Sequence, residues 1–227
     1  MHAAGGMYAT AGDLARFVRM SLYQGGLIFP KRVIEETQSP QIHLKRKFAR
    51  YDRFAYGLGW YLADYDGDLL IHHFGGFRGA QAHMSFMPDR GLGVVVLTNT
   101  DAPLAHSIAS FVYDSLLKKG DAQKRLDEDV QHFIEQKAKR AESLKTQVEK
   151  ALANVSDSKE RAADGTYVGD YGTMIVKANT IAIGAMHSTL VHAKGASYVV
   201  HFAPDEPTIV TFKGNSLNWD GQEFGRR

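Results

Sequence analysis

The chain has 227 residues, of which 44% are hydrophobic and 23% are charged, and its formal net charge is +2 at pH 7. This length suits one large domain or two modest ones with a real core. The small net charge, with no basic patch of interleaved aromatic residues, argues against a nucleic-acid partner. Zero cysteines exclude disulfides, thiolate metal sites and cysteine nucleophiles.

No apolar run approaches the ~20 residues that a membrane-spanning helix needs. Residues 1–13 lack the basic region and the apolar region of a signal peptide. We therefore expect neither a membrane span nor a signal peptide within this sequence.

The first predicted element is a helix in the segment TAGDLARFVRMSLYQGG, residues 10–26. Thr10 or Asp13 can cap its start, and Gly25 and Gly26 end it. Its apolar stripe, at three- and four-residue spacing, consists of Leu14, Phe17, Val18 and Leu22.

Strands follow. The stretch FAYGLGWYL (54–62) has apolar residues at every second position, which predicts a single strand. The side chains on one face of that strand are Phe54, Tyr56, Leu58, Trp60 and Leu62. A turn at residues 66–68 leads into LLIHH, and a turn at residues 89–91 joins two further strands. Such short links predict an antiparallel meander.

The last of these strands, LGVVVLTN (92–99), is apolar on both faces, so each face needs a cover. A helix over about residues 103–118 is expected to cover one face.

Residues 121–160 are rich in charge and predict a helix with one apolar stripe. The stripe consists of Val130, Ile134, Ala141, Leu144, Val148 and Leu152. We expect a connecting helix packed on a neighbour, with an oligomer contact as the alternative. Residues 164–227 hold six or seven short β-rich runs, which predict a small antiparallel barrel or sandwich.

The predicted fold class is therefore α+β: an antiparallel sheet flanked by helices, followed by a small all-β barrel or sandwich. We expect three divisions, at residues 1–118, 119–162 and 163–227. The middle one is the charged connecting helix.

Two neighbouring histidines end the strand LLIHH. His73 shares a face with Ile71, whereas His72 points to the other face, so the two cannot chelate one metal ion together. His83 can lie across the hairpin, but two histidines without a third ligand make a poor zinc site. We predict no metal, and local hydrogen bonding of strand-end histidines remains an alternative to a functional role.

The glycines that follow, Gly75, Gly76 and Gly79, add a second signal. Glycine at a strand end lets a backbone or a ligand approach closely. A backbone N–H exposed there can stabilise a developing oxyanion. The same pattern also fits an irregular loop with positive-φ glycines.

The stretch HHFGGFRGAQAHMSFMPDRGLGVVVLTN (72–99) resembles the third-motif hairpin of the class C β-lactamases and penicillin-recognising serine hydrolases, which carries a Lys-Thr-Gly strand. Other segments follow the family order. AAGGMYATAGDLARF resembles the helix after the active-site loop, YGLGW resembles the Gly-Leu-Gly-Trp strand, and LGVVVLTN resembles the last core strand. The resemblance covers residues 3–118 and implies the C-terminal portion of a β-lactamase-like serine hydrolase domain over residues 1–118.

This resemblance gives His73 the position of the motif's lysine, and several esterase and peptidase branches carry His-x-Gly there. It implies a catalytic role for His73 and substrate-binding or oxyanion roles for Gly75 and Gly76. Imidazole titrates near ~6.5, whereas lysine is charged at neutral pH. We therefore predict weak capture of a substrate carboxylate and a preference for ester or peptide substrates.

Half of the family's active site is missing from the sequence. The family supplies its nucleophile from a Ser-x-x-Lys, followed by a Tyr-x-Asn or Ser-x-Asn that precedes the third motif. Tyr-x-Asn does not occur here, and Ser-x-Asn occurs only at residues 216–218, far beyond the third motif. Ser-x-x-Lys occurs at residues 115–118 and 156–159, after the third motif, where neither serine can lie beside His73 in the family's geometry. The chain is expected to be inactive alone, as a truncation or as a natural degenerate protein.

The implied reaction is acyl-enzyme hydrolysis of a small amide, ester, peptide or β-lactam, without a cofactor. The implied partner is the missing N-terminal half, with self-association as the other way to cover exposed edges. The alternative is a noncatalytic module that binds a peptide or a cell-wall fragment.

The resemblance also suggests an extracytoplasmic location and an appended lipocalin-like β-domain that opens with TYVGDYG. Within it, Tyr167, Tyr171 and Trp219 are expected to be core aromatic residues.

Overall fold

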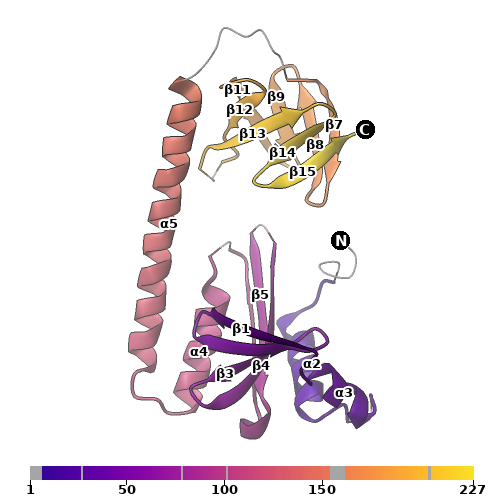
Figure 1. Ribbon diagram of the computed structural model, residues 1–227, viewed down its shortest axis with the longest axis vertical. Coiled ribbons are helices and arrows are strands. Elements are labelled where there is room, and N and C mark those ends of the chain that lie inside the picture. The colour runs from indigo at the N-terminus through magenta and orange to yellow at the C-terminus, as the bar shows by residue number, and fades with distance from the viewer. Residues whose placement is uncertain (1–6, 27, 78, 101, 154–161, 204–205) are drawn as a thin grey trace. The chain divides into compact units, whose positions relative to one another are not determined.

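The computed structural model describes residues 7–26, 28–77, 79–100, 102–153, 162–203 and 206–227. The chain divides into two compact units, Met1–Ile134 and Glu135–Arg227, and the division falls within the long helix α5 (Ala122–Ala153). Each unit contains one antiparallel sheet, which confirms the predicted α+β class (Figure 1). Within the described ranges, no helix is long and apolar enough to cross a membrane.

The sheet of the first unit is a six-stranded meander in which every strand pairs with its sequence neighbours. Its strands are β1 (Ile42–Phe48), β2 (Tyr51–Tyr56), β3 (Tyr61–Tyr65), β4 (Asp68–Phe77), β5 (Ala80–Met87) and β6 (Leu92–Thr98). Asp66 and Gly67 turn the chain between β3 and β4 with φ values of 56° and 92°. The short helix η1 (Pro88–Arg90) and Gly91 make the turn before β6. The predicted meander and both of its predicted turns are confirmed.

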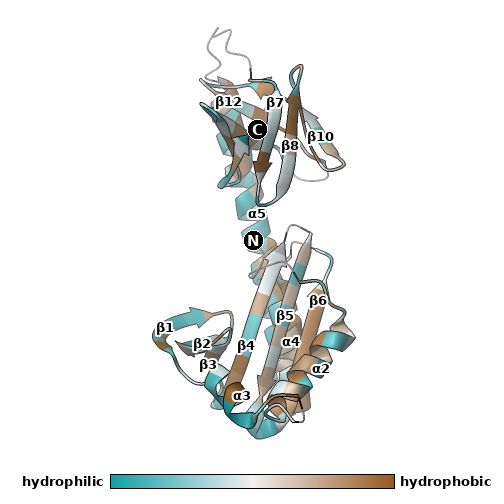
Figure 2. Cartoon of the chain, turned by 90° about the vertical axis from the view of Figure 1, so that its right-hand side faces the viewer, coloured by the Kyte–Doolittle hydropathy of each residue, from teal (hydrophilic) through white to brown (hydrophobic). Residues whose placement is uncertain are grey.

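Helices cover both faces of this sheet, because the apolar strand β6 needs a cover on each side. Helix α2 (Ala11–Leu22) packs on one face and α4 (Leu104–Leu116) on the other, beside β5 and β6 (Figure 2). A shorter helix, α3 (Lys31–Thr37), follows α2. Thr10 caps α2, since its hydroxyl accepts the Asp13 N–H at 3.1 Å.

Each face has its own apolar core. On the α2 side the buried residues are Val18, Trp60, Ile71 and Phe86. On the α4 side they are Tyr51, Ala63, Tyr65, Leu70, Met87, Val94, Ala109 and Tyr113. The alternation predicted for the strand LLIHH is therefore observed, since Leu70 and Ile71 point into different cores.

The prediction of one strand over residues 54–62 is wrong, because the chain reverses between β2 and β3. The Gly57 N–H donates to the Trp60 carbonyl at 2.8 Å, and Gly59 has a φ of 86°. A Cβ on Gly57 would lie 2.4 Å from the Thr37 carbonyl oxygen, so no other residue fits there. Two glycines that the alternating pattern tolerated are thus the residues that make the hairpin.

The same correction changes which side chains of β2 are buried. Tyr51, Arg53 and Ala55 form its buried face, whereas Phe54 is 42% exposed. The predicted face contained Phe54 because the apolar alternation was carried through the turn. Because the buried position 53 is an arginine, a hydrophobicity pattern does not identify which face of this strand is buried.

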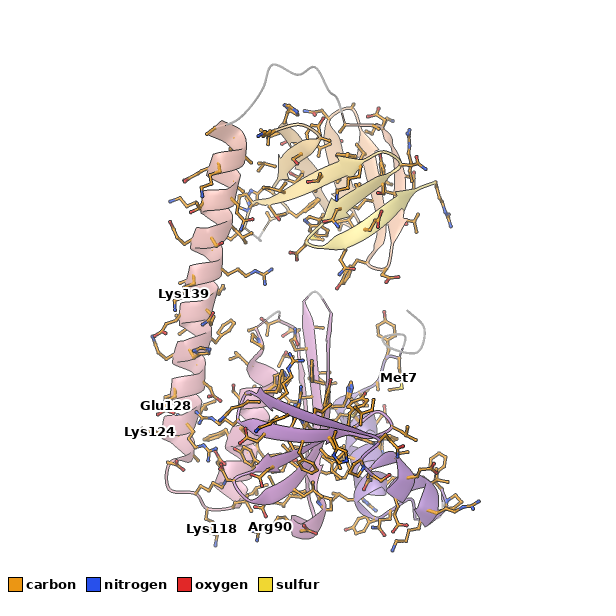
Figure 3. The ribbon with its side chains drawn as sticks, in the orientation of Figure 1. Met7, Arg90, Lys118, Lys124, Glu128 and Lys139 are labelled. Carbon is orange, nitrogen blue, oxygen red and sulfur yellow. The ribbon has the colours of Figure 1, made fainter. Side chains whose placement is uncertain are left out.

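Helix α5 is charged along its length and has no buried residue in its described part. Its first turn is tied to the β3–β4 turn, where Arg125 Nη1 lies 2.6 Å from Asp66 Oδ2. Lys124 and Glu128 lie one turn apart on the same helix (Figure 3). The Ser-x-x-Lys at residues 156–159 lies outside the described residues.

The second unit contains a nine-stranded antiparallel sheet that forms a nearly closed barrel, in the order β10-β9-β8-β7-β15-β14-β13-β12-β11. The strands are β7 (Gly165–Gly169), β8 (Gly172–Lys177), β9 (Thr180–Ile183), β10 (Met186–Thr189), β11 (Val191–His192), β12 (Ser197–Val200), β13 (Thr208–Lys213), β14 (Ser216–Trp219) and β15 (Gln222–Arg226). The six or seven strands predicted from the sequence are fewer than the nine observed. A strand as short as the two-residue β11 is too short to show an alternating pattern.

The barrel encloses an apolar core of its own. The residues of this core lie between Ala162 and Phe224 in the sequence. Tyr167 and Trp219 are buried in it, as predicted. Tyr171 is 38% exposed, so the prediction of a core role for it is wrong. It lies in the turn between β7 and β8.

Candidate active site

The candidate site lies where β4 extends beyond its neighbour β3. The pairing of these strands runs from Tyr65 opposite Asp68 to Tyr61 opposite His72. Among the described strands, residues 73–77 pair with β5 alone. The backbone groups on their other edge are therefore available to an additional strand or to an extended ligand.

The predicted site residues His73, Gly75 and Gly76 all lie on this edge. A Cβ on Gly75 would meet no atom within 4 Å, so the space beside that residue is open. A Cβ on Gly76 would lie 2.9 Å from the Gln81 side-chain oxygen. Gly79, with a φ of 78°, belongs to the turn that follows. The face of the strand is thus open at Gly75.

The imidazole of His73 is half-buried and held by aromatic residues of β2 and β3. Its Nε2 lies 3.2 Å from the Tyr56 hydroxyl. The Tyr61 ring stacks on it, with ring centroids 5.6 Å apart and an interplanar angle of 20°. Burial lowers the pKa of His73, a backbone hydrogen bond with Phe74 opposes this, and the charge of Arg53 lowers the pKa further. At neutral pH the ring is therefore neutral.

On the α4 side of the same strands, three further histidines are packed together. His83 Nδ1 lies 3.0 Å from His106 Nδ1, and His83 Nε2 lies 2.8 Å from the Ser85 hydroxyl. The ring of His72 stacks on that of His83 at a centroid distance of 5.9 Å. His106, from α4, is a member of this cluster that the sequence gave no reason to select.

These three rings are neutral because they are buried. Burial lowers the pKa of His72 to about 2, that of His83 to about 3 and that of His106 to about 4, with the charge of Arg53 contributing to each. Both ring nitrogens of His83 are engaged in hydrogen bonds, which leaves it no lone pair for a metal. In the described part of the chain, no group of three His, Cys, Asp or Glu side chains has the geometry of a metal site.

Arg53 lies between the site and this cluster. It is 3% exposed, and its guanidinium carbon lies 3.9 Å from the Phe48 ring centroid and 3.7 Å from that of Tyr61. Its Nε donates to His72 Nε2 at 3.2 Å, whereas its Nη2 has no hydrogen-bond partner. Burial lowers the pKa of Arg53 to about 10, so it stays charged at neutral pH. The guanidinium thus packs on the Phe48 and Tyr61 rings, and its carbon lies 5.3 Å from the ring centroid of Phe74, the middle residue of His-x-Gly.

Sequence reasoning missed Arg53 and Tyr56 as neighbours of the site. Both come from β2, and only recognition of the Gly57–Trp60 turn would have shown that this strand pairs with β3, next to β4.

The first Ser-x-x-Lys, at residues 115–118, is not near the candidate site. Ser115 is exposed at the end of α4. The preceding residue, Asp114, accepts a hydrogen bond from Tyr65 at 2.8 Å beside the β3–β4 turn. That turn is at the opposite end of β4 from His73, so the structure does not bring Ser115 and His73 together.

Comparison with known families decides the assignment of the first unit. The family model described as Beta-lactamase matches residues 1–116, just over half of the chain. The chain belongs to the Beta-lactamase family. The serine hydrolase resemblance of residues 3–118 is thereby confirmed at the level of the family, and the candidate site lies within the matched region. No curated protein matches the chain.

Solved structures to which the chain is similar include the octameric penicillin-binding protein homologue from Pyrococcus abyssi, at 18% identity and a TM-score of 0.48. The match covers 95% of this chain and 46% of that one. SurE matches at 16% identity and SurE with D-Leu at 15%, with TM-scores of 0.36 and 0.34. These two matches cover 96% of this chain and 48% and 50% of theirs. The chain therefore spans about half the length of the structures it matches.

Proposed function

We propose that this chain is the C-terminal portion of a β-lactamase-like serine hydrolase, which hydrolyses an amide, an ester or a β-lactam through an acyl-enzyme. The observation that carries the proposal is the open edge of β4 at residues 73–77, with a histidine and two glycines on it. An extended acyl substrate can pair with such an edge. We propose residues 1–118 as the hydrolase portion, 119–162 as the connecting helix and 163–227 as a lipocalin-like domain.

In this function His73 hydrogen-bonds the substrate or the catalytic tyrosine, and the Gly76 N–H supports the oxyanion. Gly75 keeps the face of the strand clear next to His73, because any side chain there would project into that open space. The neutral state of His73 agrees with a preference for uncharged ester or peptide groups over a carboxylate.

The nucleophile has to come from residues that this sequence lacks. We therefore propose that the chain does not turn over substrate alone, and that an N-terminal half with Ser-x-x-Lys and Tyr-x-Asn completes the site. Self-association is the other means by which the open sheet edges would be covered.

A complementation assay tests this function. The chain is measured alone and fused to the N-terminal half of a Beta-lactamase-family hydrolase, with a chromogenic β-lactam and a p-nitrophenyl ester as substrates. We expect hydrolysis only in the fusion, and loss of hydrolysis when the serine of the added Ser-x-x-Lys is replaced by alanine. Turnover by the chain alone, or an unaffected serine variant, would contradict the proposal.

A noncatalytic peptide-binding module is the second candidate, and the same open edge favours it, because β-strand addition needs no nucleophile. Binding of an extended peptide or cell-wall fragment, without hydrolysis by the chain alone or by the fusion, would support this second function instead.

A further inference from the structure

The position of one tyrosine relative to His73 carries an inference beyond the roles assigned so far. Tyr56 is the last residue of β2, two strands away from β4. The strand between them begins only at Tyr61, which pairs with His72, so no residue of β3 lies opposite His73. The Tyr56 side chain reaches the His73 side chain across this gap, with its hydroxyl 3.2 Å from His73 Nε2.

Local structure fixes the Tyr56 ring in this orientation. It packs edge-on against the Tyr61 ring, with centroids 4.6 Å apart and an interplanar angle of 62°. The turn that follows is closed by the 2.8 Å bond from Gly57 to Trp60. The hydroxyl is therefore pre-organised and does not reach His73 by a chance rotamer.

We propose that Tyr56 is a positioning residue for His73, whose hydroxyl donates to Nε2 and holds the imidazole as its neutral Nδ1–H tautomer. This inference rests on the proposed function, because a histidine that hydrogen-bonds a substrate needs one fixed ring nitrogen facing that substrate. The groups with titratable or charged side chains around His73 are Tyr56 and Arg53 of β2, Tyr61 of β3 and His72 of its own strand. Its β5 partner, Met84, carries no charge.

The direction of the hydrogen bond follows from the chemistry of the two groups. A phenol is a stronger hydrogen-bond donor than acceptor, and the unprotonated nitrogen of a neutral imidazole is a good acceptor, so the Tyr56 hydroxyl donates to the nitrogen that it faces, Nε2. The proton of the neutral ring is then on Nδ1. Burial raises the pKa of Tyr56, so the phenol keeps the proton that it donates.

The test uses the full chain labelled with ¹⁵N-histidine, because imidazole nitrogen shifts distinguish the two tautomers and the protonated ring. A His73→Gln spectrum identifies the His73 signals. We expect the Nδ1–H pattern in the unsubstituted chain. Tyr56→Phe should give a mixture of tautomers and roughly a three- to tenfold higher proton affinity, because a hydrogen bond to the neutral ring is lost.

Tyr61→Phe is the matched control, since Tyr61 stacks on the same imidazole but its hydroxyl makes no hydrogen bond to His73 in the described contacts. It should leave the tautomer and the titration of His73 unchanged. An Nε2–H tautomer in the unsubstituted chain would overturn the proposal whether or not any variant folds. Equal spectral changes in both phenylalanine variants would also overturn it. No readout requires turnover, so a failure of the hydrolase function leaves this result unaffected.

Discussion

At the scale of single residues, the unusual feature of the first unit is the number of polar side chains buried on the α4 side of its sheet. They are tolerated because most of their polar atoms are paired. A chain of hydrogen bonds runs from His106 through His83 and Ser85 to the Tyr113 hydroxyl, with the last step 2.9 Å long. All of these groups are neutral, so this hydrogen-bonded chain is stable only while the imidazoles stay unprotonated.

The first prediction is that the first unit loses stability steeply in acid. The unfolded histidines take up protons near pH 6.5, whereas the folded pKa values of His72, His83 and His106 are about 2, 3 and 4. The unfolded state then binds more protons, so the free energy of unfolding falls as the pH drops from about 6.5 towards 4. Each ring contributes about 1.4 kcal/mol per pH unit in this window, and the three together about 4. Urea unfolding at several pH values, followed by Trp60 fluorescence in a Trp219→Phe background, measures the slope.

Two variants make this prediction specific. His106→Gln keeps a group that can hydrogen-bond His83 but cannot titrate, so the acid slope should fall by about a third of the histidine contribution. His43→Gln, at an exposed position on β1, should leave the slope unchanged. An unchanged slope in His106→Gln would show that this histidine does not remain neutral in the folded state.

At the scale of elements, the contact between α2 and β6 sets how closely a helix approaches the sheet. Gly93 of β6 faces Val18 of α2, and a Cβ on Gly93 would lie 2.5 Å from Val18 Cγ1. Val18 is 3% exposed and has no room to retreat. The absence of a side chain at residue 93 therefore lets the helix lie flat on the strand.

The second prediction concerns this contact. Gly93→Ala should lower the free energy of unfolding by about 1–3 kcal/mol, because the added methyl group would clash with the buried Val18 side chain. Val18→Ala removes the clashing methyl groups, so the double variant should lose less than the sum of the single losses. Gly120→Ala, where a Cβ would meet no atom within 4 Å, is the control and should change stability by less than about 0.5 kcal/mol. Strict additivity of the two changes in urea unfolding would contradict the packing argument.

The sequence was sufficient for elements whose pattern is local. The cap at Thr10, the turn at Asp66 and Gly67 and the alternation through His72 and His73 all follow from short-range chemistry. The hairpin at Gly57 could not be predicted in this way. The requirement for glycine at residue 57 comes from the Thr37 carbonyl, which is distant in the sequence and leaves no room for a side chain.

The candidate site divides in the same way. His73, Gly75 and Gly76 could be placed on one strand edge from sequence, because they are neighbours in the chain. That the edge is open depends on where β3 begins, and the contact of Tyr56 with His73 crosses two strands. Such facts come from register, which no local pattern specifies.

At the scale of the whole molecule, the two units have separate apolar cores. Among the residues that the structure describes, the core of the barrel is built from residues between Ala162 and Phe224. The ends of this segment meet, since Arg226 Nη2 donates to the Asp164 carbonyl at 2.6 Å and β15 pairs with β7. The Tyr167 hydroxyl also holds the start of the segment, donating to the Ala163 carbonyl at 2.8 Å. The barrel therefore holds within itself the contacts that close it.

The third prediction is that residues 162–227 fold when expressed alone. The fragment should show a dispersed amide NMR spectrum and one cooperative urea transition, because it keeps the complete core. A fragment of residues 165–227 is the matched control. It lacks buried Ala162 and both carbonyl acceptors at the closure, so its free energy of unfolding should be about 1–3 kcal/mol lower. A collapsed spectrum for the longer fragment would show that the barrel needs the rest of the chain, and would refute an independent domain over residues 163–227. Equal stability of the two fragments would refute the structural role of the closure at Asp164.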